Sequence, residues 1–231
     1  HEKLNCIYNH HEQACAIAAE SYTRLTRKLA LVCVTSGPGG TNSLTGVLGA
    51  WLDSIPMIII SGQVKRETTI WSTKVPLRQL GDQEYNIVPS VSPMTKYAKM
   101  IVDPNEIAYH LEKALFLCKS GRGGPVWLDI PLDIQAAQID PDKLIHFDPS
   151  ELADLAVPKM SLEKAKVIID KISSAKRPVI IAGSAIRLSG AHDTFVQLID
   201  KLNIPVVTAW NAHDNLWNDH PLYCGRPSTL G

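Results

Sequence analysis

The sequence predicts an α/β protein: a doubly wound parallel sheet with helices on both faces, followed by an incomplete second α/β domain. Two observations predict it. Short apolar runs rich in β-branched residues alternate with longer runs of helical period, and glycine or proline turns separate them. The composition, 45% hydrophobic and 20% charged, is that of an ordinary globular chain.

The first domain is predicted over residues 1–135. Its apolar run "LALVCVTS" is continuous rather than alternating, which is typical of a strand covered on both faces. The "GPGG" that follows is a turn into the next helix. In order, we expect a strand at 4–8, a helix at 11–27, strands at 29–36 and 55–62 flanking a helix at about 41–53, a short helix at 84–91, a strand at 95–101, a helix from about 104 to 120 and a strand at 124–131.

Residues 62–83 are polar and show no sustained period. A loop of about twenty structureless residues inside a compact domain usually carries function. We call this segment the excursion and expect it to contribute to a binding site.

Residues 136–160 are acidic and contain prolines, which indicates a linker. A second domain is predicted over 161–231, with helices at 161–176 and 190–203 and strands at 177–184 and 204–210. Two strands are too few for a complete doubly wound sheet. We therefore expect the chain to be cut at its C-terminus, and also at its start, because residue 1 falls directly before a predicted strand.

Charge and cysteine content narrow the function classes. Lys plus Arg and Asp plus Glu both number 23, so there is no net positive field to attract nucleic acid or an anionic membrane surface. The five cysteines are widely spaced and show no zinc-site pattern, which favours free thiols in a reducing compartment. No apolar run approaches the roughly 20 residues of a membrane helix. We expect a cytoplasmic protein with neither a nucleic-acid nor a membrane partner.

Two short stretches are candidates for chemistry, although each has a purely structural interpretation. "TSGPGGTN" (35–42) follows a predicted strand, where open α/β sheets bind ligands, but it is neither a P-loop nor a complete dinucleotide fingerprint. Taken alone it is a tight turn. Glu12 stands at the start of a helix, and by itself it is best interpreted as a capping-box partner of an N-cap at Asn9.

Taken together and in order, several stretches resemble the pyrimidine-binding domain of thiamine-diphosphate-dependent enzymes, and most closely the acetolactate synthase branch. The resemblance covers residues 4 to about 135, and "KRPVIIAGSAIRLSGA" resembles the start of that family's central domain. The stretches that carry it are "HHEQACAIAAESYTRLT", "VTSGPGGTNSLTGVLGAWLDSIPMIIISGQV", "DQEYNIV", "PMTKYAKMI" and "SGRGGPVWLDIPLDI".

The resemblance implies a catalytic role for Glu12: a hydrogen bond to N1′ of the cofactor's aminopyrimidine. A carboxylate there favours the protonated ring and its imino tautomer, which assists removal of the thiazolium C2 proton and so formation of the ylide. Gln83 matches a glutamine that faces the reacting centre, while an exposed polar residue is the alternative interpretation. Four residues are implied to line the pyrimidine: Thr35, Pro38, Gly39 and Asn42.

The chain departs from the acetolactate synthase pattern in the excursion, which is several residues longer and carries Asp82 where that branch has an aromatic residue. Trp71, Lys74 and Arg78 are candidates to contact an anionic substrate, but solvated loop residues are the simpler interpretation. His10 and His11 flank Glu12, and we expect both to be structural, with His11 the better candidate for a place near the cofactor.

The implied cofactor is thiamine diphosphate with Mg²⁺, whose site is expected in a C-terminal domain that this stretch lacks, so no metal ligand is assigned here. Flavin occurs in the family's central domain, but we expect no stable FAD on half of one. The implied function is that of a 2-oxo acid carboligase or decarboxylase acting on a substrate such as pyruvate, in a homodimer or higher homo-oligomer, with this stretch inactive alone.

Three alternatives stay open at this point. One is a related decarboxylase, or a carboligase with another acceptor such as a sugar-derived one. A second is a non-catalytic module of the same fold. A third is a simple nucleotide-binding domain, which would bind ADP, FAD or NAD saturably.

Overall fold

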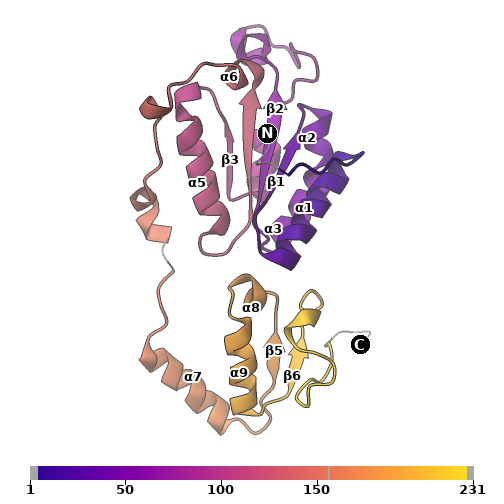
Figure 1. Cartoon of the computed structure of the whole chain (residues 1–231), viewed down its shortest axis with the longest axis vertical. Coiled ribbons are helices and arrows are strands. Elements are labelled where there is room, and N and C mark those ends of the chain that lie inside the picture. Colours follow the sequence, from indigo (N-terminus) through magenta and orange to yellow (C-terminus); the bar gives the residue numbers. More distant parts are fainter. Residues whose placement is uncertain (1–4, 156, 228–231) are drawn as a thin grey trace. The chain divides into compact units, whose positions relative to one another are not determined.

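The structure is a computed structural model that describes residues 5–155 and 157–227 (Figure 1). The chain divides into two compact units, His1–Ala156 and Val157–Gly231. Among the described helices, none combines the length and apolar character needed to cross a membrane.

The first unit contains a four-stranded parallel sheet in the order β1-β2-β4-β3. This arrangement confirms the predicted α/β class. The strands are β1 (Ala30–Val34), β2 (Met57–Gln63), β3 (Tyr97–Met100) and β4 (Pro125–Pro131), and the α-helices are α1 (Glu12–Thr26), α2 (Pro38–Asn42), α3 (Leu44–Leu52), α4 (Val88–Val91), α5 (Ile107–Lys119) and α6 (Leu132–Gln135).

Helices cover both faces of this sheet. Successive residues of a strand point to opposite faces, so neighbouring residues contact different helices. Ile58 and Val126, partners in the β2–β4 register, pack with Ala114 of α5 in one core cluster. The next residue, Trp127, is fully buried on the opposite face, where its ring lies near Gly40 of α2. Short helices fill the remaining connections, namely 3₁₀ turns at Arg66–Thr68, Ile70–Ser72, Ser92–Met94, Pro104–Glu106, Pro141–Lys143 and Pro149–Leu155.

The expectation that β1 is buried on both faces is wrong. Val32 and Val34 are buried, but Leu31 is 55% exposed and Cys33 is also exposed. Their register partners, Ile58 and Ile60, place them on the α5 face of the sheet. β1 is an edge strand, so its α5-side residues stay uncovered in the described part of the chain.

Three other predicted elements differ from the structure. Residue 4 lies outside the described residues, and 5–8 form no strand; Ile7 and Tyr8 are highly exposed. The helix expected from about 41 begins at Pro38, a residue whose fixed φ suits the first helical position, and breaks at Ser43. The helix expected at 84–91 forms only over Val88–Val91, since Glu84 is engaged by loop amides.

α1 and α3 pack closely because of one glycine. A Cβ on Gly46 of α3 would lie 2.6 Å from Ala16 Cβ and 2.8 Å from the Ala16 carbonyl carbon. Both contacts involve α1, whose first residue is Glu12. The missing side chain at Gly46 therefore sets how closely the helix that carries Glu12 approaches α3.

A polar cluster is buried in the middle of the sheet, near the carboxyl ends of β2 and β4. The fully buried Asp129 accepts hydrogen bonds from Ser61 Oγ (2.5 Å) and Gln63 Nε2 (3.1 Å), and Trp127 Nε1 donates to Ser61 Oγ (2.8 Å). Burial raises the pKa of Asp129 to about 6, although both hydrogen bonds act to lower it.

The second unit is smaller and contains a parallel pair of strands, β5 (Ile180–Ala182) and β6 (Val206–Thr208). Its core joins Ala182 and Val206 to Ile199 of α9 and to Leu216. α9 ends at Asn203, which adopts the left-handed conformation common at helix C-termini. The helices of this unit are α7 (Leu162–Ser174), α8 (Ala185–Leu188) and α9 (His192–Leu202), with a 3₁₀ turn at His213–Asn215.

Two glycines of α3 form a matched test of the packing. Gly46→Ala places a methyl group against α1 backbone and should lower the free energy of unfolding by about 2 kcal/mol. Gly49→Ala meets nothing within 4 Å and should raise it by about 0.5–1 kcal/mol through helix propensity. Urea unfolding followed by far-UV circular dichroism compares the two, and a Gly46→Ala chain as stable as the parent would contradict the close approach.

The raised pKa of Asp129 predicts a pH-dependent stability. The folded chain binds this proton more tightly than the unfolded chain, so the stabilisation is complete below about pH 4 and is lost as the pH rises through 6. Asp129→Asn does not ionise, so its stability relative to the parent should rise by about 2 kcal/mol between pH 4 and pH 7.5. Urea unfolding at both pH values measures the difference, and the exposed Asp142→Asn is the control. A constant difference for Asp129→Asn would refute the prediction.

Candidate functional site

Three segments meet at the carboxyl edge of the first sheet. The 35–42 turn leaves β1 at this edge and the excursion leaves β2 beside it. α1 leads into the start of β1 through a short connection, so its N-terminus lies back at the same edge. Open parallel sheets bind ligands at this position.

Glu12 is the first residue of α1, and it is partly exposed. The N-cap is His11, whose Nδ1 accepts the Gln13 N–H at 3.1 Å. The expected capping box with Asn9 as N-cap is therefore wrong, because Asn9 donates instead to Cys15 Sγ. The Glu12 carboxylate is directed across to the glycine turn, where Asn42 Nδ2 donates to its Oε2 at 3.1 Å.

Hydrogen bonds lower the pKa of Glu12. The backbone N–H of Glu12 itself contributes most, followed by the Asn42 amide. Glu12 is consequently ionised at neutral pH and presents a negative charge beside the turn.

The backbone of Gly39, in the glycine turn, lies next to this carboxylate. A Cβ on the buried Gly39 would lie 2.7 Å from Thr35 Cγ2 and 3.8 Å from Glu12 Oε1. We call the side-chain-free backbone of Gly39, between Thr35 and Glu12, the cradle. The structure thus brings together Glu12, Thr35, Gly39 and Asn42, while Pro38 begins α2 with its ring exposed.

Gln83 lies against the same turn through its backbone. A Cβ on Gly37 would stand 2.3 Å from the Gln83 carbonyl oxygen, so only glycine permits this approach. Both residues have positive φ, +54° at Gly37 and +57° at Gln83. The Gln83 side chain is exposed at the edge of the sheet.

Sequence reasoning missed the groups that support this edge. Gln63 Nε2 donates to Tyr85 O at 2.8 Å as well as to Asp129, so the buried cluster is joined to the segment that follows Gln83. A single aspartate inside the apolar run "VWLDIP" was the available signal for Asp129. Glu84, which binds three loop amides, gave no sequence signal beyond its charge.

The other residues singled out in the sequence are not drawn into the cradle. His11 caps α1 and His10 is exposed. Trp71, Lys74 and Arg78 are exposed on the excursion. Within residues 5–155 and 157–227, no three or more His, Cys, Asp or Glu side chains are grouped to hold a metal ion.

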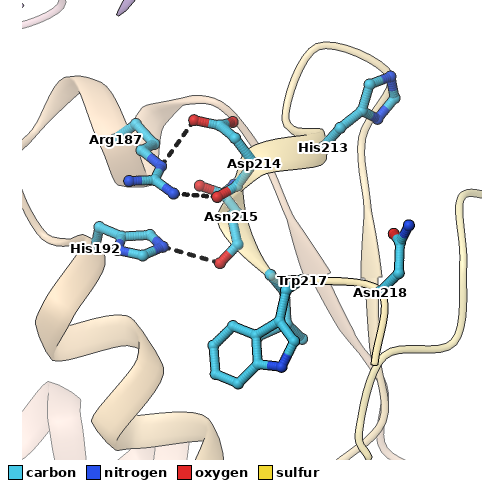
Figure 2. Close-up of a pocket in the computed structure, with 8 residues that line it drawn as sticks. Arg187, His192, His213, Asp214, Asn215, Trp217 and Asn218 are labelled. Carbon is cyan, nitrogen blue, oxygen red and sulfur yellow. Dashed lines mark hydrogen bonds and ion pairs between the residues drawn. The ribbon is translucent and has the colours of Figure 1, made fainter. Parts of the chain in front are cut away.

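The second unit contains a hollow of about 420 Å³ (Figure 2). It lies between the ends of α8 and α9 and the segment 213–218. Arg187 Nε pairs with Asp214 Oδ2 at 2.8 Å, and His192 Nε2 lies 3.0 Å from Asn215 O. These contacts hold the 213–218 segment against the two helices. The charges of Arg187 and Asp214 offset each other in this ion pair.

Comparison with known proteins identifies both units. Residues 1–84 match the family model described as "Thiamine pyrophosphate enzyme, N-terminal TPP binding domain", which includes Glu12 and the glycine turn. Residues 165–231 match the model described as "Thiamine pyrophosphate enzyme, central domain". The two matches occur in the order in which the sequence resemblance placed them.

Individual relatives support the same family assignment. The chain is 35% identical over 237 residues to a probable acetolactate synthase large subunit of Methanococcus aeolicus, covering 100% of this chain and 37% of that protein. It is 34% identical to the acetolactate synthase large subunit of Lactococcus lactis (100% and 38%) and 33% identical to the acetolactate synthase of Arthrospira platensis (96% and 37%). The chain thus spans well under half the length of these relatives. With both family models matched in order and such relatives along nearly its whole length, the chain belongs to the thiamine pyrophosphate enzyme family.

Proposed function

We propose that this chain is part of a thiamine-diphosphate-dependent enzyme that acts on a 2-oxo acid such as pyruvate, as acetolactate synthase does. The observation that carries the proposal is the position of the ionised Glu12 carboxylate beside the side-chain-free backbone of Gly39. When bound, thiamine diphosphate supplies the nucleophilic carbon and the electron sink that a 2-oxo acid needs to lose carbon dioxide.

The residues present suit the pyrimidine end of that cofactor. Gly39 lacks the Cβ that would fill the cradle, so a flat ring can approach the backbone there. Glu12 stands at one side of this space and can hold a proton on a ring nitrogen, because an anionic carboxylate stabilises the protonated form. Asn42 keeps the carboxylate oriented by donating to its other oxygen.

Gln83 would face the reacting centre from the opposite side of the glycine turn. Its exposed amide can both donate and accept, which suits the carbonyl and carboxylate of a 2-oxo acid. We further propose a homodimer or higher homo-oligomer in which a C-terminal domain supplies the diphosphate and Mg²⁺ contacts.

A second candidate is a decarboxylase or carboligase with a different acceptor, for example a sugar-derived one. The exposed Asp82 in place of an aromatic residue, directly before Gln83, favours it because a charged neighbour changes the substrate-facing edge. Product analysis of the complete enzyme supplied with pyruvate distinguishes the two: acetolactate supports the first, and its absence while carbon dioxide is released supports the second.

Substitution of Glu12 separates chemistry from helix capping. Glu12→Gln should lower turnover of the complete enzyme about 100-fold or more, because the neutral amide does not stabilise a protonated ring nitrogen. Glu163 also lies in the first turn of a helix, α7, and is exposed, so Glu163→Gln should leave turnover within about twofold. Steady-state kinetics at saturating cofactor measure both. Unchanged turnover in Glu12→Gln would favour the non-catalytic module.

Filling the cradle tests cofactor binding directly. Gly39→Ala should weaken thiamine diphosphate binding to the complete enzyme by about tenfold or more. Because the new methyl group also meets Thr35 Cγ2, the double variant Gly39→Ala/Thr35→Ser relieves that clash and still occupies the cradle. Calorimetric titration should show weak binding in both and near-parental binding in Thr35→Ser alone. Parental affinity in the double variant would place the ring elsewhere.

A further inference from the structure

The excursion is closed at its neck by a single carboxylate, that of Glu84. Its Oε1 accepts the backbone N–H of Ile70 at 2.7 Å. Its Oε2 accepts the N–H groups of Leu80 at 2.8 Å and Gly81 at 3.2 Å. One side chain therefore joins the outgoing and returning limbs of the loop, and we call these three hydrogen bonds the staple.

The staple encloses the tip of the excursion. Residues 71–79 lie between its two ends, and Trp71, Lys74 and Arg78 are exposed there. Gly81 is packed so tightly that a Cβ would lie 2.7 Å from Thr68 O. The neck is consequently closely packed, and the tip is tied to it by Ser72 Oγ, which donates to Thr69 O, and by Gln79 Nε2, which donates to Gly81 O.

The same segment fixes Gln83. Glu84 is its chain neighbour, and Tyr85 O is bound by Gln63 Nε2 from the buried cluster. On the other side, the Gln83 carbonyl lies against Gly37 of the glycine turn. Gln83 is thus held between the cradle and the staple, in a positive-φ conformation that an unrestrained glutamine rarely adopts.

A second anchor holds the base of the excursion. Arg66 Nε pairs with Asp133 Oδ2 of α6 at 2.6 Å, and the Arg66 backbone N–H donates to Asp133 Oδ1 at 3.0 Å. This anchor fixes where the loop starts but not how its two limbs are joined. The staple joins the two limbs, at Ile70 on one side and at Leu80 and Gly81 on the other.

From these contacts we infer that Glu84 is a positioning residue: through the amides of Ile70, Leu80 and Gly81 it presents Gln83 and the 71–79 tip to the 2-oxo acid. The inference rests on the proposed function for its kinetic consequence but not for the staple itself. A hydrogen bond to a charged acceptor is stronger than a neutral one, so replacing the carboxylate by an amide should open the neck.

The experiment compares Glu84→Gln with Glu67→Gln in the complete enzyme. Glu67 lies on the same excursion but is exposed, and Lys65 Nζ lies 3.9 Å from its Oε1. Hydrogen exchange should become about tenfold faster at Ile70, Leu80 and Gly81 in Glu84→Gln and stay unchanged in Glu67→Gln. Glu84→Asp keeps the charge with a shorter reach, so it should be intermediate, and it replaces Glu84→Gln if that variant fails to fold.

The kinetic readout separates positioning from general damage. In Glu84→Gln, KM for the 2-oxo acid should rise about fivefold or more while affinity for thiamine diphosphate stays within about twofold, because Glu12 and Gly39 lie on other segments. Unchanged exchange would overturn the staple. Faster exchange with an unchanged KM would overturn the positioning role. A parent enzyme that converts no 2-oxo acid would overturn the proposed function and with it the kinetic role, while the exchange result would still decide the staple.

Discussion

The hydrogen bond from Asn42 to Glu12 connects two segments 30 residues apart, and the site at the carboxyl edge depends on it. It is made only because α1 returns to the edge where β1 ends and because Gly46 lets α1 approach α3 closely. A longer side chain at Gly46 would move the helix on which Glu12 is mounted. The close packing of α1 on α3 thus determines where the Glu12 charge lies relative to the backbone of Gly39.

The carboxylates of Asp129 and Glu12 show how the local environment shifts a pKa in opposite directions. Asp129 is fully buried, and burial raises its pKa to about 6, whereas hydrogen bonds to partly exposed Glu12 lower its pKa. Only Glu12 borders the cradle; Asp129 is bound by Ser61 and Gln63 beneath the sheet edge. A raised pKa alone would have pointed to Asp129 as the reactive acid. In the structure Asp129 instead accepts a hydrogen bond from Gln63, which also donates to Tyr85 O after Gln83.

The sequence allowed the sheet, most helices and the glycine turn to be predicted, because their periodicity and turn residues are local signals. It failed where the outcome depends on distant partners. The continuous apolar run predicted that Leu31 and Cys33 are buried. Both are exposed, because β1 lies at the edge of the sheet. The local pattern predicted Asn9 as the N-cap of α1, but the N-cap in the structure is His11. The staple joins Glu84 to Ile70 across 14 residues, and no local pattern records such a bond.

The staple also bears on how this chain can depart from acetolactate synthases without losing the cradle. Once the neck is closed at Ile70 and Leu80, residues added to the 71–79 tip cost little, because loop-closure entropy grows only slowly with loop length. The Gln83 carbonyl meets Gly37 outside the 71–79 tip. A change in the excursion can therefore alter this part of the sheet edge while Glu12, Asn42 and Gly39, which lie on other segments, keep their contacts.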